Sequence, residues 1–489
     1  MTGTLMTSAV TADLVITGGT IVTHETTIRA ALAIRDGVIV AIGDEESMPA
    51  AKETLNADGM YLLPGAIDVH VHFRDPGYTH KETWETGTAA AAMGGVTTVF
   101  DMPNTNPPTG TLEALQQKLA LADQQAYVDF GIYGLLGAEN IDELQDLAED
   151  GIIGFKCFMG NTFGNLPAPS TGAMLEAFER VAPTGLRVSL HAETASVMAW
   201  RYERLRAAGR NDPLAHIAAR PAVVAIEAVS RAAILSEWTG TRVHVLHVSS
   251  ADELRPLREA KQRGVDITCE TCPHYLLLNT DDYDRLGSLI RVNPPVREAT
   301  DSAAIWDGIR DGTVDMIATD HAPHTPEEKC NDNIWKADCG FPGVETQMPL
   351  MLTSVNNGQI SIHDYVRLTA VSPARAWGLY PRKGALIPGS DADIAIVDMA
   401  RKTTIRESEL HSTSARISPY NGWEVTGLPI HTLVRGRFVM RDRQLVTEAR
   451  GHGRTVKPLQ KMPPARVTNA DKTLAAELAK APAKGRNEL

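Results

Sequence analysis

The sequence lacks any long hydrophobic run. No segment reaches the roughly 20 consecutive apolar residues that a helix needs to cross a bilayer. Residues 1–19 (MTGTLMTSAVTADLVITGG) also lack the basic stretch followed by an apolar run that marks a secretory signal peptide. We therefore predict a protein that does not span or bind a membrane, and we expect it in the cytoplasm.

The sequence also contains few cysteines and has no excess of positive charge. Five cysteines in 489 residues are too few for a disulfide framework. Cys269 and Cys272 form a CxxC pair, but Cys330 and Cys339 are too far apart to complete a zinc site, so we expect buried bystanders. The net charge of −13 argues against nucleic acid as a partner, although it allows a local basic pocket for an anionic substrate.

Similar strand-like runs occur near both ends of the chain. Residues 12–22 and 30–42 are apolar runs punctuated by glycine and Asp-Gly turns, and the same texture returns at 392–399 and 431–446. The two ends are therefore expected to form one small β-sandwich domain. Its predicted parts are residues 1–65 and 381–454, and a mobile tail rich in Lys, Ala and Pro is expected over 455–489.

The long insert between these ends alternates short apolar runs with helix-length, alanine-rich stretches. Repeated units of this kind indicate a parallel sheet, and seven or eight of them favour an α/β fold of the (β/α)8 TIM barrel type over residues 66–380. Several runs end in polar residues. The C-terminal ends of the strands are where such barrels carry their chemistry.

Two features of the insert suggest metal chemistry. His70 and His72 follow an apolar run, and residues two apart on a strand point to the same face, so both imidazoles could reach one metal; a chance pair is equally compatible with HxH alone. Lys156 lies in the apolar run IIGFKCFMG, where burying a charged amine is costly. It either reaches the surface at a strand end or is a neutral amine that takes up CO2 to form a metal-bridging carbamate.

Three further residues end strand-like runs: His191, His247 and Asp320. A single histidine at a strand end is usually a core residue, whereas an aspartate there could bind metal and accept a proton. Together the series His-x-His, Lys, His, His, Asp resembles the binuclear cyclic amidohydrolases, which include dihydroorotase, hydantoinase and allantoinase, over about residues 12–450. The resemblance implies two divalent metal ions, with zinc expected, and Asp320 as the catalytic base. The implied metal ligands are His70, His72, carboxylated Lys156, His191, His247 and Asp320.

Residues 68–109 (DVHVHFRDPGYTHKETWETGTAAAAMGGVTTVFDMPNTNPPT) resemble dihydroorotase most. That resemblance implies that Arg74 and Asn104 bind a substrate carboxylate, which a guanidinium fork suits. The structural alternative is an arginine paired with Asp75 or Glu82. Other segments similar to dihydroorotase imply further substrate contacts from Asn293, His324, Cys339, Gly340 and a loop pair, Thr162 and Phe163.

The expected function is therefore dihydroorotase, the reversible interconversion of N-carbamoyl-L-aspartate and dihydroorotate in pyrimidine biosynthesis. GFKCF around Lys156 is closer to allantoinases and to animal-type dihydroorotase than to many bacterial dihydroorotases. Allantoinase, hydantoinase (dihydropyrimidinase) or another cyclic-imide hydrolase remains the alternative. A non-catalytic scaffold is the rival from another class, but such proteins typically lose metal ligands. The expected partners are a small cyclic amide and, as is common in this family, further copies in a homodimer or homotetramer.

Overall fold

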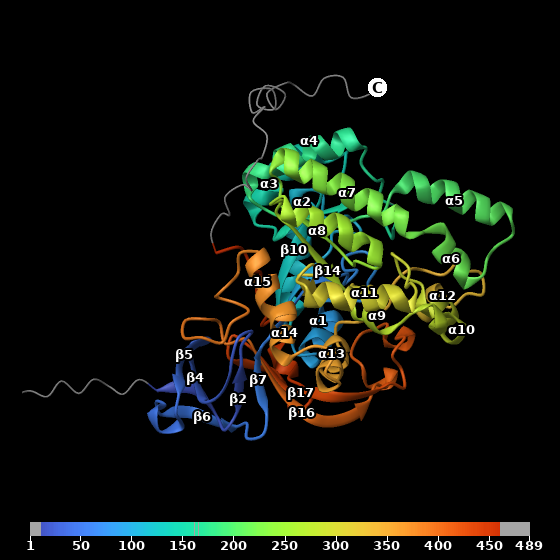
Figure 1. Cartoon of the computed structure of the whole chain (residues 1–489). Helices are drawn as coiled ribbons and strands as arrows, with labels where there is room; N and C mark the ends of the chain where they lie inside the picture. Colours follow the sequence, from blue (N-terminus) through green and yellow to red (C-terminus); the bar gives the residue numbers. More distant parts are fainter. Residues whose placement is uncertain (1–10, 161, 165, 460–489) are drawn as a thin grey trace, which may run out of the picture.

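A barrel of parallel strands lies at the centre of the protein, whose computed structural model describes residues 11–160, 162–164 and 166–459 (Figure 1). Eight strands pair in chain order: β8 (Ala66–Val71), β9 (Val96–Asp101), β10 (Asp129–Leu135), β11 (Gly154–Phe158), β12 (Val188–His191), β13 (Val243–Val245), β14 (Ile267–Thr271) and β15 (Met316–Ile317). The ring closes where Val71 forms a parallel bridge with His321 and the His72 N–H donates to the His321 carbonyl at 2.8 Å. The predicted (β/α)8 barrel is confirmed.

Helices cover the outside of the barrel. The strands are buried along nearly their whole length, as expected for parallel strands packed on both faces. Five of the covering helices are the first α-helix after a strand: α1 (Trp84–Met93), α2 (Leu112–Gln125), α3 (Leu144–Asp150), α4 (Thr171–Val181) and α8 (Leu254–Gln262). The others come after further helices in the same connection: α7 (Ala222–Thr239), α11 (Ala299–Arg310), α14 (Ile362–Val366) and α15 (Ser372–Ala376). Side-chain caps fix several starts: Thr83 accepts from the Thr86 N–H, and Ser170 from the Ala173 N–H.

Several helices lie in the connections beyond the C-terminal ends of the strands. Among them, α5 (Ala195–Ala207) and α6 (Pro213–Ala219) extend to one side of the barrel in Figure 1. The others are α9 (Pro273–Leu277), α10 (Tyr283–Leu286), α12 (Pro326–Lys329) and α13 (Gln347–Asn356). Residues of α5 and of the segments after α6 and α12 line a cleft at the mouth of the barrel, whereas α13 packs against β17 (Glu424–Val434) of a separate sheet.

Both ends of the chain contribute to two further sheets. The four-stranded sheet has the order β5 (Val38–Gly43), β4 (Ala31–Arg35), β1 (Ala12–Thr17), β6 (Ala51–Asn56). The seven-stranded sheet has the order β19 (Gln444–Leu445), β18 (Arg437–Arg441), β17 (Glu424–Val434), β16 (Ile394–Thr404), β7 (Tyr61–Pro64), β2 (Thr20–Val22), β3 (Thr27–Arg29). In it β7 pairs antiparallel with β16, and Leu14 and Ile34 share a core with Ile394 and Leu433. The predicted composite β-domain is confirmed.

The chain stays packed beyond residue 454. The Phe130 N–H donates to the Arg454 carbonyl at 3.0 Å, and the Val456 N–H donates to the Phe130 carbonyl at 2.8 Å. The Leu459 N–H donates to the Gly378 carbonyl at 2.9 Å. Residues 455–459, the start of the predicted mobile tail, are therefore held by backbone hydrogen bonds to Phe130 of β10 and to Gly378. Residues 460–489 lie outside the described residues.

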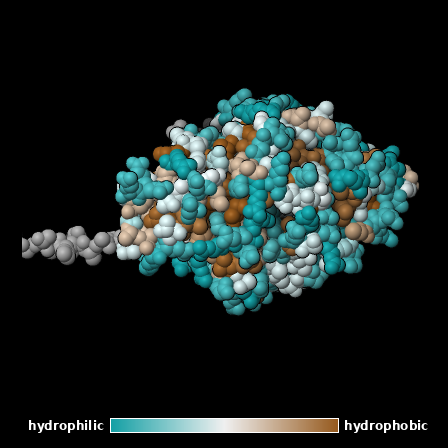
Figure 2. Space-filling view, turned by 90° about the horizontal axis from the view of Figure 1, so that it is seen from below, coloured by the Kyte–Doolittle hydropathy of each residue, from teal (hydrophilic) through white to brown (hydrophobic). Residues whose placement is uncertain are grey.

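The surface agrees with the hydropathy of the sequence. Figure 2 shows one face on which hydrophilic residues dominate and hydrophobic patches are small and separated. Among the described residues, no helix is long and apolar enough to cross a membrane. Cys269 and Cys272 are buried free thiols, as predicted. The cytoplasmic location and the homodimer or homotetramer stay predictions.

Candidate functional site

The predicted chemical residues converge on one pocket at the C-terminal ends of the barrel strands. His70 lies in β8, Lys156 in the middle of β11 and His191 at the end of β12. His247 and Asp320 lie just beyond β13 and β15. All six proposed metal ligands line this pocket, together with Arg74, Asn104, Thr162, Phe163, Asn293 and Cys339.

Three pocket residues have a left-handed backbone conformation. The φ angles are 62° at Arg74, 42° at His247 and 48° at Asp320. Non-glycine residues adopt this conformation at a cost of about 1–3 kcal/mol each, and such positions cluster at functional sites. Each of the three follows a barrel strand and lines the pocket. The left-handed turn ends the extended backbone there, so the side chain is directed into the pocket.

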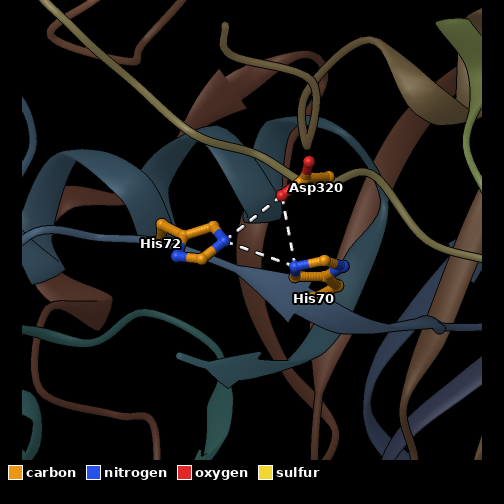
Figure 3. Close-up of side chains that lie close together, drawn as sticks. All are labelled: His70, His72 and Asp320. Atoms are coloured by element: carbon orange, nitrogen blue, oxygen red, sulfur yellow. Dashed lines mark hydrogen bonds and ion pairs between the residues drawn. The ribbon is translucent and has the colours of Figure 1, made fainter. Parts of the chain in front are cut away.

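Three acceptor atoms face one another in the first cluster (Figure 3). His70 Nε2 and His72 Nε2 are 3.3 Å apart, and each lies 3.2 Å from Asp320 Oδ1. The opposite ring nitrogens face acceptors: His70 Nδ1 lies 2.6 Å from Glu270 Oε1, and His72 Nδ1 lies 2.7 Å from Asn104 Oδ1. Each imidazole therefore carries its proton on Nδ1, which leaves both Nε2 lone pairs directed at the carboxylate.

The two Nε2 lone pairs and the Asp320 carboxylate repel one another, and a cation placed between the three atoms would be attracted by all of them. Burial holds the pKa of both His70 and His72 well below the usual range; the positive charge of Lys156 adds to this at both rings, and that of Arg74 at His72. Neither ring is therefore protonated to pair with Asp320, whose own pKa is raised by burial. Two neutral imidazoles and a carboxylate are a ligand set that suits zinc and similar divalent metals. These residues fit a metal ion.

A second pair of imidazoles lies beside the first cluster. His191 Nδ1 and His247 Nε2 are 2.9 Å apart, and the ring centroids of His70 and His247 are 5.4 Å apart. His191 Nε2 lies 2.9 Å from Glu193 Oε2 but has no hydrogen-bond partner among the described residues. Burial lowers the pKa of both rings. This pair could hold a second cation.

Lys156 differs from the other buried lysines. Lys118 forms an ion pair with Asp101, and Lys383 lies 2.6 Å from both Asp129 and Asp393. Lys81 and Lys329 also have hydrogen-bond partners. Within the described ranges, the Lys156 amine has no hydrogen bond or ion pair, and burial lowers its pKa to about 8. Its Nζ lies 4.7 Å from the centroid of the Phe158 ring. A buried amine that is partly neutral and has no hydrogen-bond partner is suited to react with CO2.

Arg74 lines the pocket and has N–H groups that are not fully hydrogen-bonded. Its Nε lies 3.4 Å from the Pro323 carbonyl and its Nη2 3.5 Å from His324 Nε2, while Nη1 is buried with no partner among the described residues. The predicted structural alternative is wrong, because in the described part of the chain Arg74 pairs with neither Asp75 nor Glu82. Phe163 covers the guanidinium, whose Cζ lies 4.3 Å from the ring centroid.

The remaining predicted contacts divide into pocket-lining and supporting residues. Asn293 lines the pocket with a buried, unpartnered Oδ1 in the described structure, whereas Asn104 uses Oδ1 to hold His72. His324 lies behind Arg74, bound to the Cys339 carbonyl at 3.0 Å. The Gly340 N–H donates to the Arg291 carbonyl at 2.9 Å, and the predicted backbone contact from Gly340 to a substrate stays a prediction. A side chain at Gly340 would also strike Ala322, 2.5 Å from the Cβ position.

Glu270 is a residue of the site that the sequence analysis did not identify. It lies in β14, with its carboxylate between His70 Nδ1 at 2.6 Å and His244 Nε2 at 2.9 Å. Burial raises its pKa, and the two facing N–H groups favour the carboxylate form. The signal that could have found it is its position among the polar residues at the end of a predicted strand.

The family is shown by comparison with known proteins. The profile of the amidohydrolase family matches residues 61–439. The chain belongs to this family. An L-hydantoinase from Paenarthrobacter aurescens is 35% identical over 449 residues, covering 91% of this chain and 98% of the relative. An allantoinase from Rubrobacter xylanophilus has the same identity and coverage.

Solved structures agree with this amidohydrolase assignment. L-Hydantoinase (dihydropyrimidinase) from Arthrobacter aurescens superposes with a TM-score of 0.89 at 35% identity, covering 91% of this chain and all (100%) of that one. D-Hydantoinase (dihydropyrimidinase) from Thermus sp. gives 0.86 at 30% identity, covering 92% and 100%.

The prediction of a cyclic amidohydrolase is confirmed, in the form given as its alternative. The similar proteins carry the names hydantoinase and allantoinase, and these names do not support the expected dihydroorotase or its role in pyrimidine biosynthesis. The arginine and asparagine of the HxHxR and MPN motifs, Arg74 and Asn104, led the sequence comparison toward dihydroorotase. In the structure Asn104 Oδ1 faces His72, while Nδ2, the atom that would donate to a carboxylate, lies 3.4 Å from the Phe163 carbonyl. The Asn104 contact to a substrate carboxylate stays a prediction.

Proposed function

We propose that the protein hydrolyses a ring amide of a hydantoin-type cyclic ureide that carries a carboxylate close to the ring. The observation that carries this proposal is the buried, unpartnered Nη1 of Arg74 in the pocket wall. A buried guanidinium donor without an acceptor is unfavourable, and a carboxylate satisfies it with charge-assisted hydrogen bonds. The names of the relatives support hydrolysis of a cyclic ureide, and Arg74 supports a carboxylate on that substrate.

Two divalent cations, which we propose to be zinc, would be held by the two histidine groups. His70, His72 and Asp320 would hold one, His191 and His247 the other, and a carbamate on Lys156 would lie between them. When bound, such cations supply Lewis acidity that acidifies water toward neutral pH and polarises a carbonyl. The carbamate forms when the neutral Lys156 amine adds to CO2 and releases one proton.

Asp320 is the proposed carrier of the proton. Its carboxylate accepts a proton from the attacking water as the water oxygen bonds to the ring carbonyl carbon. When the C–N bond breaks, the same oxygen returns the proton to the leaving ring nitrogen. The product is the open-chain carbamoyl amino acid, with no net change in protons on the protein.

Allantoin is the second candidate substrate. The buried Asn293 Oδ1, which lacks a donor among the described residues, is suited to receive an N–H from a ureido group on the ring. Arg74 would then face a ring carbonyl instead of a carboxylate. The relatives named allantoinase support this alternative.

A substrate series tests the proposal. With metal-loaded protein in bicarbonate buffer, we expect kcat/KM for 5-carboxymethyl-hydantoin to exceed that for hydantoin by about a hundredfold, the effect of a charged hydrogen-bonded contact. Dihydroorotate serves as a six-membered acid for comparison. A preference for allantoin would favour the second candidate, and failure to open any of these rings would reject the proposed function.

A further inference from the structure

A second cleft adjoins the reaction pocket. Thr162, Phe163, Asn293 and Cys339 line both, so a substituent that leaves the inner pocket passes directly into the outer cleft. The outer walls come from helix α5, the segment after α6 and two loops. They include Tyr202, Arg206, Arg220, Arg291, Trp335 and Asp338.

The charge of this cleft is opposite to that of the whole protein. Three arginines and one carboxylate, Asp338, line it. Asp338 already lies 3.0 Å from both Lys81 and His324, and Arg220 is paired with Glu193, which leaves Arg206 and Arg291. Arg291 is 8% exposed, and its Nε has no hydrogen-bond partner in the described part of the chain. Arg206 forms no ion pair within the same residues. In a chain of net charge −13, Arg206 and Arg291 at one cleft favour an anion there.

An aromatic platform holds Arg206 at the cleft. Its Cζ lies 5.8 Å from the Tyr202 ring centroid and 5.5 Å from that of Trp335, and the two rings meet edge to face at 5.0 Å. Arg220 Nε donates to the Tyr202 hydroxyl at 2.8 Å, and Trp335 Nε1 donates to the Arg210 carbonyl at 2.7 Å. Both rings are therefore fixed. Stacking restrains the guanidinium but leaves its N–H groups free for a ligand.

We infer that the outer cleft is a second carboxylate subsite, which binds the end of a long acidic chain on the substrate ring. The inference rests on the proposed function, because the ring must occupy the inner pocket for its chain to reach the cleft. Arg74 would bind an acid close to the ring, and Arg206 with Arg291 an acid several bonds farther out. The enzyme should therefore accept two classes of acidic cyclic ureide, distinguished by chain length.

Arg206→Gln tests the subsite, with Arg204→Gln as a matched control. Arg204 lies on the same exposed helix but stacks on Trp200, 5.0 Å from its ring, outside the cleft. The substrates are hydantoins with a 5-carboxybutyl, 5-carboxymethyl or neutral 5-butyl group. We expect R206Q to lower kcat/KM about tenfold for the carboxybutyl compound, and less than about twofold for the others. The effect is smaller than at Arg74 because Arg206 is exposed and its charge is screened by solvent. R204Q should leave all three unchanged.

The outcomes separate the subsite from the proposed function. If R206Q lowered kcat/KM equally for both acids, Arg206 would only attract anions at long range, and the subsite would be rejected. Unchanged turnover of the carboxybutyl compound would reject it too, while leaving the ring chemistry intact. If the wild-type protein opened none of the three rings, the proposed function itself would fail.

Discussion

Replacing Lys156 by alanine should abolish ring opening, with kcat lower by at least about a thousandfold. Loss of the carbamate would remove the bridge between the two proposed cations, whose Lewis acidity is worth several kcal/mol of the barrier. Acetate or propionate should restore part of the activity, because the residue is 1% exposed and its removal leaves a cavity beside the metal ligands. Steady-state turnover with and without added acid measures both effects.

Lys118→Ala provides the contrast for this prediction. Lys118 is also fully buried, but it pairs with Asp101 and donates to the Met102 carbonyl at 2.7 Å. Its removal strands a buried carboxylate, so we expect a lower Tm and no recovery with short acids. Full activity of Lys156→Ala without added acid would contradict the carbamate. Equal rescue of both variants would show that the acids act by general stabilisation.

Arg74→Met should separate acidic from neutral substrates. Removing the guanidinium should lower kcat/KM for 5-carboxymethyl-hydantoin by about a hundredfold, because the carboxylate would be buried without a charged partner. Hydantoin itself should lose less than about threefold. The decisive quantity is the ratio of the two kcat/KM values in the variant and in the wild type.

Arg74→Lys is the conservative partner of that variant. Lysine keeps the positive charge but lacks the planar fork, so we expect its selectivity ratio to lie between those of the wild type and Arg74→Met. Equal losses on the acidic and neutral rings in Arg74→Met would show that Arg74 organises the pocket and does not select the substrate. Comparing Tm among the three proteins controls for misfolding.

The sequence could predict the pocket because strand ends meet at one edge of a barrel. His70, Lys156, His191 and Asp320 each follow or interrupt an apolar run, and parallel strands bring such positions together whatever the loops do. The composite β-domain could be predicted in the same way, since the two ends share a strand-like texture. The domain boundaries themselves stay a prediction.

Other features depend on contacts that a sequence does not encode locally. Nothing near Asn104 indicates that its oxygen holds His72, and nothing near Gly340 indicates that its N–H is bonded to Arg291. The same limit applies to residues 455–459, whose backbone completes the pairing of β10. The motif around Arg74 indicates an acid-binding arginine, but it does not distinguish the rings to which that acid is attached.

A metal titration tests the central claim most directly. Metal-free protein in bicarbonate buffer is titrated with Zn2+, while bound metal and the opening of 5-carboxymethyl-hydantoin are both followed. Activity should be absent at the start, rise with bound metal and level off at two ions per chain. Full activity in metal-free protein, or a protein that binds two ions without opening the ring, would contradict the proposed binuclear ring-amide hydrolase.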